Sequence, residues 1–371
     1  MRILIILHKE KKRGGLVLQF LKMSRIFKQE GHKLKIFSMD SVNKQKNFLG
    51  NIIINIKILK KIVKEFEPSI IITSDPFITT SMALLSNKKG IPIVSRAGAV
   101  YHSFYAARIF ESISYEKIYS QLYRFLNQIL KFIAKIFYKK IDFIIFNSQY
   151  LSDIYANSNS YVILNGVEIS KLNTIQAYKP TRLIYVGRIE PRKSIELIIK
   201  ALAILNLTSN NFMVSLVGDT SMNRVYWNKI TNLIDKRNLS SQIKILGEID
   251  NQKLPAILQE HDILLFSSDE RNFPMTEGLP NVILEGMANG LAIIATKIAG
   301  VPEILKENNG FLVDSEPEIF AEKIKYLMDN KEVLIQMKKT NIETIRKNHN
   351  IENVSKKYLK IFEKIIKRKN S

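Results

Sequence analysis

The chain has 371 residues, of which 46% are hydrophobic, with 56 Lys and Arg, 34 Asp and Glu, a net charge of +22 and no cysteine. At roughly 150 residues per domain, this length predicts two domains that each bury a core. The absence of cysteine excludes disulfides, thiolate metal sites and thiol nucleophiles, and the five histidines lie at no metal-ligand spacing from one another, so we expect no metal site.

Short apolar runs alternate with helical patterns along nearly the whole chain. We predict strands near 2–7, 33–38, 69–73, 91–95, 142–146 and 161–164 in the first half, and near 182–186, 212–217, 243–246, 262–266 and 292–295 in the second. Strictly alternating strands and helices predict an α/β fold with parallel sheets covered on both faces. Binding sites in such sheets lie beyond the carboxyl ends of the strands.

A polar stretch from residue 165 to residue 180 separates the two halves. It predicts an N-terminal domain of 1–172 and a C-terminal domain of 173–350, two doubly wound domains with a ligand cleft between them. Residues 351–371 have the pattern of a basic helix, which we expect to cross back to the N-terminal domain.

The positive charge is concentrated in the first half. Residues 1–180 contain 28 Lys and Arg against 11 Asp and Glu, whereas residues 181–371 contain 28 against 23. The first half is therefore expected to face phospholipid, a phosphorylated substrate or nucleic acid. The N-terminal apolar run is too short for a signal peptide, and no apolar stretch reaches the ~18 residues that cross a bilayer. We expect a cytoplasmic protein, in solution or peripheral on the inner face of the cell membrane.

Residues 117–140 are the most basic part of this half, with six Lys and Arg and no acidic residue. Arg124, Lys131 and Lys135 recur at helical spacing, opposite apolar residues that include Phe125 and Phe132. The pattern fits an interfacial helix that docks on anionic lipid. It fits equally a core-packing helix whose outer face is basic.

The segment from residue 262 to residue 303 is the richest in candidate binding groups. A buried strand leads into a polar loop, then into Glu277-Gly278-Leu279-Pro280-Asn281, and then into a helix that carries Glu285. Asn281 is a plausible N-cap, and the helix start offers unpaired N–H groups to phosphate or sugar oxygens. Both carboxylates could accept hydrogen bonds from the hydroxyls of one sugar ligand. Alternatively, Glu277 is a solvated loop residue, and Glu285 is an acidic residue in the first turn that interacts favourably with the helix dipole.

A second candidate segment, residues 185–194, combines a strand end, a glycine turn at Gly187 and a helix that starts near Ser194. Arg188 and Lys193 lie where parallel-sheet proteins bind anions, and two cations would suit a diphosphate. We expect Glu190 and Arg192 to point to solvent.

In these motifs the chain resembles a retaining family 4 glycosyltransferase. Glu277 and Glu285 match the E-x7-E motif of that family, and Gly187-Arg188 with Lys193 match its "GR…K" segment. Further matches, in family order, are Gly14-Gly15, Gly31-His32, Asn165-Gly166-Val167-Glu168, Gly218-Asp219, Leu246-Gly247, Gly300-Val301-Pro302-Glu303 and Asn309-Gly310. The "EGxPN" form at 277–281 is similar to that of bacterial polysaccharide-assembly members.

The resemblance implies a GT-B fold, two facing Rossmann-like domains around a central cleft. It implies metal-independent, retaining hexosyl transfer from a nucleotide-sugar co-substrate, by default UDP-linked, with no other cofactor. The acceptor would be a glycan or lipid-linked glycan in the biosynthesis of cell-surface polysaccharide, capsule or lipopolysaccharide.

The roles of individual residues follow from the same resemblance. Arg188 and Lys193 would hold the donor diphosphate, Glu277 the donor sugar and Glu285 the ribose, with Glu277, Arg188 and Lys193 as the catalytic set. The donor-binding set is Gly15, Gly187, Arg188, Lys193, Glu277, Gly278, Leu279, Pro280, Asn281 and Glu285.

Three departures from the family pattern bear on this assignment. Pro280 replaces a common glycine and removes one N–H donor, and Ser194 replaces the usual glycine after the lysine. No histidine follows the fourth strand, where Arg96 or the later His102 is the acceptor-side candidate and a surface role for His102 is the alternative.

Two other functions remain open. One is a non-catalytic GT-B relative that binds sugar. The other is a basic nucleic-acid-binding protein, but the chain lacks an RNP motif, a zinc finger and an arginine-rich arm, so we expect no specific nucleic acid partner.

Overall fold

The computed structural model describes residues 1–8, 15–39, 48–87, 89–100, 121–139, 141–155, 159–170, 175–269 and 277–370. Its contacts divide the chain into two compact units. The N-terminal unit comprises Met1–Gly166, Thr276–Leu279 and Ile351–Ser371, and the C-terminal unit comprises Val167–Met275 and Pro280–Asn350. The sequence predicts boundaries after residues 172 and 350, and it gives no indication that 276–279 belong to the N-terminal unit.

The N-terminal unit is built on a six-stranded sheet in the order β2-β1-β3-β4-β5-β6, in which all neighbours are parallel. Its strands are β1 (Arg2–Leu7), β2 (Lys33–Ser38), β3 (Ile70–Thr73), β4 (Ile93–Ala97), β5 (Phe143–Phe146) and β6 (Ser160–Val162). Its helices are α1 (Gly15–Gln29), α2 (Phe48–Phe66), α3 (Ile78–Ser86), α5 (Gln121–Lys139), α6 (Gln149–Tyr155) and α14 (Ile351–Asn370). All six predicted strands are confirmed to within about two residues at each end.

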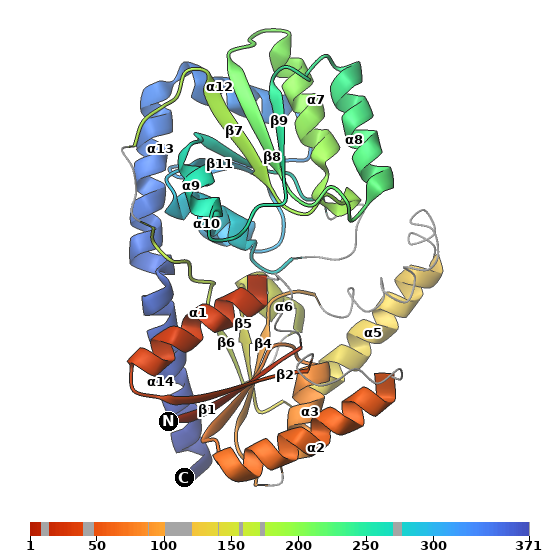
Figure 1. Ribbon diagram of the computed structural model, residues 1–371, viewed down its shortest axis with the longest axis vertical. Coiled ribbons are helices and arrows are strands. Elements are labelled where there is room, and N and C mark those ends of the chain that lie inside the picture. Colours follow the sequence, from red (N-terminus) through yellow and green to blue (C-terminus); the bar gives the residue numbers. More distant parts are fainter. Residues whose placement is uncertain are drawn as a thin grey trace. The chain divides into compact units, whose positions relative to one another are not determined.

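Alternate residues of β1 pack on opposite faces of this sheet. Ile3 and Ile5 lie in one buried cluster with α1 and α14, and Leu4 and Ile6 lie in another with α2 and α3. The first and last helices of the chain therefore run side by side on one face (Figure 1). The C-terminal helix is confirmed to return to the N-terminal unit.

The C-terminal unit contains a second parallel sheet, in the order β12-β11-β10-β7-β8-β9. Its strands are β7 (Thr181–Val186), β8 (Phe212–Val217), β9 (Ile243–Gly247), β10 (Ile263–Phe266), β11 (Ala292–Thr296) and β12 (Gly310–Val313). Its helices are η3 (Pro191–Lys193), α7 (Ile195–Asn206), α8 (Arg224–Lys236), α9 (Leu254–Gln259), α10 (Asn281–Ala288), α11 (Val301–Ile304), α12 (Pro317–Asp329), α13 (Lys331–Thr344) and η4 (Ile345–His349). Five of the strands are confirmed, and the edge strand β12 was not predicted.

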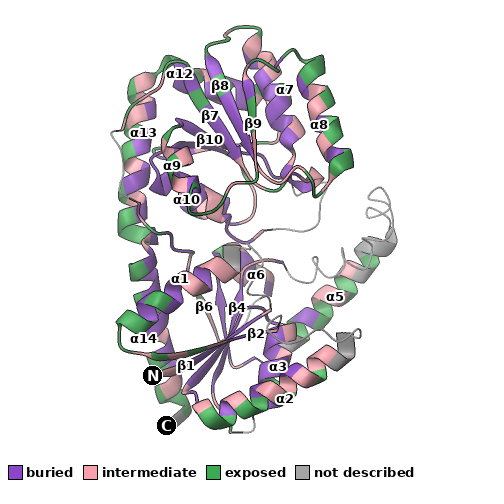
Figure 2. Cartoon of the chain, viewed as in Figure 1, coloured by how far each residue is buried: buried purple, intermediate pink, exposed green. Residues whose placement is uncertain are grey.

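The core of the C-terminal unit forms around the central strands β7 and β10. Apolar residues of α7, α8 and α12 pack on one face, in a single buried cluster with the sheet. On the other face α10 approaches the sheet so closely that a Cβ on Gly286 would lie 2.8 Å from Leu264. Figure 2 shows the central strands of both units as buried, with exposed residues mainly on the edge strands, the outer helices and the loops.

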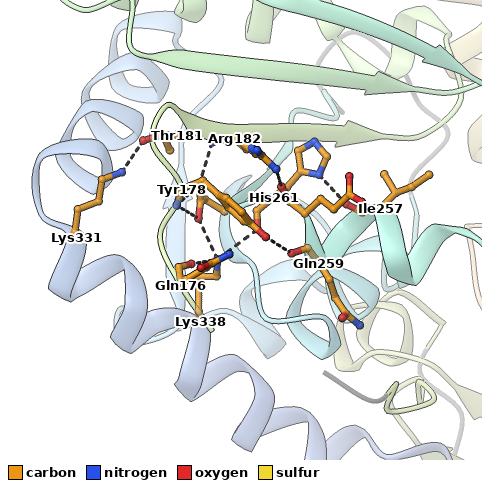
Figure 3. A network of polar contacts seen from close by, with 11 residues as sticks. Gln176, Tyr178, Thr181, Arg182, Ile257, Gln259, His261, Lys331 and Lys338 are labelled. Carbon is orange, nitrogen blue, oxygen red and sulfur yellow. Dashed lines mark hydrogen bonds and ion pairs between the residues drawn. The ribbon is translucent and has the colours of Figure 1, made fainter. Parts of the chain in front are cut away.

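A buried ion pair fixes the start of β10. Asp262 is fully buried and accepts a hydrogen bond of 3.0 Å from Lys338 Nζ, as well as from the backbone N–H groups of Tyr178 and Arg182 (Figure 3). The helix α13, the segment before β7 and the strand β10 are joined at this point. Of the helices in the described part of the chain, none combines the length and the apolarity needed to cross a bilayer.

Candidate functional site

The first element of the candidate site is the turn that follows β7. Gly187 N donates to Val217 O at 3.0 Å, and Tyr185 Oη donates to Arg188 O at 2.9 Å. A Cβ on Gly218 would lie 2.1 Å from Gly187 O, so the ends of β7 and β8 approach too closely for a side chain at that position. Arg188 follows in this turn, and 54% of its side chain is exposed, so a ligand can reach its guanidinium group.

Lys193 is a buried cation of the site. Its side chain is only 7% exposed, and its Nζ lies 5.1 Å from the ring centre of Phe266, the last residue of β10. The carbonyl oxygen of Lys193 accepts a hydrogen bond of 2.8 Å from Ser267 Oγ. These contacts join η3 to the carboxyl end of β10, so the ends of β7 and β10, which are neighbours in the sheet, contribute to one edge.

The backbone conformation of Ser194 is one that favours glycine, the residue usual after the lysine in the resembled family. It adopts φ 44° and ψ 49°, the left-handed conformation that glycine takes without strain. The start of α7 beside it is fixed by Tyr226, whose hydroxyl accepts from Ile195 N at 3.0 Å and donates to Glu196. Burial is the main reason that the pKa of Tyr226 is raised, followed by the charge of Glu196. No local pattern in the sequence indicates this contact.

The expectation that Arg192 points to solvent is wrong. Its side chain is 6% exposed, and its Nη2 lies 2.9 Å from Glu190 Oε1. The same oxygen lies 3.3 Å from Arg188 Nη2, and the Glu190 side chain is mostly covered, so the expectation that Glu190 points to solvent is also wrong. The physical reason is the tight turn of η3, which directs the stem of Arg192 inward.

Glu285 comes from α10, which follows β10. The side chain is partly buried, and the helix begins at Asn281 with Pro280 as its N-cap and no capping side chain. The expectation that Asn281 is the N-cap is therefore wrong by one residue, because Asn281 is the first helical residue. Arg188, Lys193 and Glu285 all belong to the C-terminal unit and lie on segments that follow β7 or β10.

Glu277, Gly278 and Leu279, by contrast, are anchored in the N-terminal unit. Glu277 forms an antiparallel bridge with Ala99, just beyond β4, and Gly278 N donates to Gly98 O at 3.3 Å. A Cβ on Gly278 would lie 2.2 Å from Asn147 Oδ1 and 2.8 Å from Gly98 O, so this position requires glycine. The two glutamates of the motif thus belong to different units.

Two buried polar residues complete this anchor. Asn165 Nδ2 donates to Leu279 O at 3.3 Å, and Arg96 Nη2 donates to Asn165 Oδ1. Arg96 is 1% exposed, with its guanidinium carbon 5.3 Å from the ring centre of Phe20. Its predicted part in acceptor binding stays a prediction. Gly15 is the first residue of α1, and Gly14 and His102 lie outside the described residues.

Comparisons with known proteins fit this arrangement. Residues 13–171 match the model of Glycosyltransferase Family 4, and residues 172–344 match that of Glycosyl transferases group 1. A capsular polysaccharide biosynthesis glycosyltransferase, CapH of Staphylococcus aureus, is 27% identical over 218 residues, 57% of this chain and 59% of CapH. The chain spans about three fifths of the length of the first curated relatives that it matches.

Solved structures share the fold over the whole chain. A glycosyltransferase from Rickettsia africae ESF-5 matches with a TM-score of 0.77 and 19% identity, covering 99% of both chains. Anabaena Alr3699/HepE, solved in complex with UDP, matches with a TM-score of 0.74 and 16% identity, covering 98% of this chain and 100% of that one.

The two six-stranded parallel sheets with their helices define an α/β protein of the GT-B type. The chain carries a Glycosyltransferase Family 4 domain followed by a Glycosyl transferases group 1 domain.

Proposed function

We propose that the protein is a retaining glycosyltransferase that moves a sugar from a nucleotide-sugar to a glycan or lipid-linked glycan acceptor, in the biosynthesis of capsule or another cell-surface polysaccharide. The observation that carries the proposal is Lys193, a buried cation at the carboxyl edge of the sheet, with Arg188 on the neighbouring turn. Two cations on segments that follow neighbouring strands suit a diphosphate, whose oxygens accept charge-assisted hydrogen bonds.

In this proposal Arg188 and Lys193 bind the donor diphosphate and stabilise the negative charge that develops as it leaves. They supply positive charge from the protein itself, and we propose transfer without a metal ion for that reason. Glu285 binds the ribose hydroxyls, and the start of α10 at Asn281 offers N–H groups to donor oxygens. Pro280 contributes no N–H, which leaves Asn281 as the first donor of that helix.

Glu277 and the backbone of Gly278 and Leu279 are proposed to hold the donor sugar. A carboxylate accepts hydrogen bonds from two neighbouring hydroxyls, which suits a hexose. Gly15, at the start of α1, and Gly187, on the rigid turn after β7, would allow the diphosphate to approach the backbone closely.

The nucleotide and the stereochemistry rest on similarity to known glycosyltransferases. A UDP-sugar is the proposed donor because the structural neighbour HepE binds UDP. Retention at the anomeric carbon is proposed because the spacing of Glu277 and Glu285 matches the motif of retaining family 4 enzymes. A location in the cytoplasm or at the inner face of the membrane, where nucleotide-sugars are made, belongs to the same proposal.

A thermal-shift screen with UDP-, GDP- and ADP-sugars, followed by a transfer assay, tests the function. Preferential stabilisation follows ligand affinity directly. Lys193→Met should lower the turnover by about 100-fold or more, the usual effect of losing one group that stabilises developing charge. Lys200→Met, on the exposed side of α7, is the matched control and should transfer at the wild-type rate. Equal turnover of the two variants would contradict the role of Lys193.

The same experiment separates the alternative functions. A non-catalytic relative would be stabilised by nucleotide-sugars in the thermal-shift screen without turning any of them over. A nucleic-acid-binding protein would show neither effect.

A further inference from the structure

Helix α5 exposes an apolar face that the fold of the N-terminal unit does not use. Among the side chains of α5 that the structure describes, five large apolar residues are exposed: Phe125, Ile129, Phe132, Ile133 and Ile136. The two phenylalanine side chains are 65% and 66% exposed, values far from those of a core helix. Their spacing of three, four and seven residues places all five on one side of the helix.

The opposite side of α5 is the side that packs on the unit. Ala134 and Tyr138 are fully buried there, and the Tyr138 ring stacks on Tyr155 with ring centres 4.3 Å apart. Tyr138 also meets the edge of Phe77, next to the start of α3. The helix is therefore held in place by one side while its apolar side remains on the surface, as Figure 2 shows for its exposed residues. A core-packing helix with a basic outer face does not fit this arrangement.

Helix α5 also carries positive charge. Helix α5 has four Lys and Arg and no acidic residue. Lys131 and Lys135 each precede an exposed apolar residue by one position, about 100° around the helix. Long cationic side chains in such positions can reach the phosphates of a bilayer while the apolar residues enter its acyl region.

We propose that this face of α5 docks on an anionic lipid bilayer, parallel to its surface. The charge decides between a bilayer and a second copy of the chain. Pairing two copies through α5 would bring two sets of cations together without a single acidic residue on the helix to compensate them. An anionic bilayer supplies both the apolar depth and the negative charge.

Flotation of the full chain with lipid vesicles tests the proposal. We expect binding to vesicles of phosphatidylcholine with phosphatidylglycerol, and at least about tenfold weaker binding of the double variant Phe125→Glu, Phe132→Glu, because both rings lose their apolar burial. The matched control is the double variant Leu207→Glu, Val225→Glu. It makes the same charge change at residues 86% and 84% exposed in the C-terminal unit, and it should bind like the wild type.

Three results would overturn the proposal: no binding of the wild type to anionic vesicles, equal losses in the two double variants, or a wild-type dimer that only the α5 variant dissociates. As a second measurement, Phe132→Trp in a Trp227→Phe background should be quenched by lipids brominated on their acyl chains. Absence of quenching in vesicle-bound protein would count against insertion. Neither readout depends on sugar transfer, so the docking proposal and the proposed function can fail separately.

A second inference rests on the buried contacts of Asn165. We infer that Asn165 and Arg96 are positioning residues for the backbone at 277–279, an inference that rests on the proposed function. Asn165 is 4% exposed and links Arg96 Nη2 to Leu279 O, while Gly278 N is bound to Gly98 O. The loop proposed to hold the donor sugar is thus bound by the side chain of Asn165 and the backbone of Gly98.

Asn165→Asp separates positioning from structural support. The new carboxylate still accepts from Arg96, so we expect the variant to fold, but it cannot donate to Leu279 O. We expect kcat/KM for the nucleotide-sugar to fall at least about tenfold, the cost of one hydrogen bond between a buried donor and a carbonyl. Asn55→Asp is the control, because Asn55 is a buried asparagine of the same unit whose Nδ2 contacts only Asn51 O in α2.

Hydrogen exchange gives a readout that does not need activity. The Gly278 amide should exchange faster in Asn165→Asp than in the wild type, because the loop loses one of its anchors. Wild-type exchange together with wild-type kcat/KM in this variant would overturn the inference. Faster exchange in a protein that transfers no sugar would leave the anchor intact and refute the proposed function instead.

Discussion

The buried pair of Asp262 and Lys338 gives the sharpest prediction about stability. Asp262 is 0% exposed and Lys338 is 4% exposed, with 3.0 Å between Oδ1 and Nζ. Lys338 Nζ also donates to Gln176 O at 2.7 Å, and Asp262 accepts from two backbone N–H groups (Figure 3). Lys338→Met removes the cation and leaves the carboxylate in the core. The cost of breaking a buried pair in this way is about 3–5 kcal/mol.

The double variant Lys338→Met, Asp262→Asn sets the scale of that cost. Asparagine keeps an oxygen for the N–H groups of Tyr178 and Arg182 but carries no charge, so we expect the double variant to be less destabilised than Lys338→Met alone by about 2 kcal/mol. Burial lowers the pKa of Lys338, and the charge of Asp262 opposes that shift. The desolvation of the lysine therefore offsets part of what the pair contributes.

Urea unfolding followed by tryptophan fluorescence measures the free energy of unfolding of the C-terminal unit. Trp227 is the single tryptophan of the chain and lies in α8 of the C-terminal unit, as does the ion pair. A cost below about 1 kcal/mol for Lys338→Met, or a double variant as unstable as the single one, would refute the reasoning.

Three further predictions concern single residues. The pKa of His261 is lowered mainly by burial, and its Nε2 lies 2.8 Å from Ser215 Oγ. As the pH drops below about 6.5, the unfolded chain takes up the proton before the folded protein does, so the free energy of unfolding should fall. Urea unfolding at several pH values measures this fall, which should be smaller in His261→Gln. Ser194→Gly should raise the free energy of unfolding by about 0.5–1 kcal/mol, because it relieves a left-handed serine, and an unchanged urea midpoint would contradict that strain. Gly278→Ala should cost about 1–3 kcal/mol and reduce sugar transfer, because its Cβ would lie 2.2 Å from Asn147 Oδ1; wild-type stability and kinetics would show that the loop adapts.

The sequence predicted the fold well because the strands are strong local signals. Buried runs such as Ile3–Leu7 and Leu264–Phe266 carry apolar residues on both faces of the strand. This is the pattern of a parallel sheet that is covered by helices on both sides. The edge strand β12 was not predicted from the sequence, because its apolar run is only Phe311 to Val313, between Asn309-Gly310 and Asp314.

The site was predicted less completely because its arrangement depends on contacts between distant parts of the chain. Gly278 is bound by Gly98, and Leu279 by Asn165, across more than 100 residues. No local sequence pattern predicts such contacts. Likewise, periodicity showed that α5 has an apolar face, but only its packing shows that this face is exposed.

Product analysis with a nucleotide-sugar and a glycan acceptor tests the central claim most directly. Proton NMR of the product reports the configuration at the new glycosidic bond from the coupling of the anomeric proton. We predict a product with the anomeric configuration of the donor, formed with release of the nucleoside diphosphate and lost in Lys193→Met. An inverted product would contradict retention, and a product formed equally by Lys193→Met would contradict the cationic diphosphate site on which the proposed function depends.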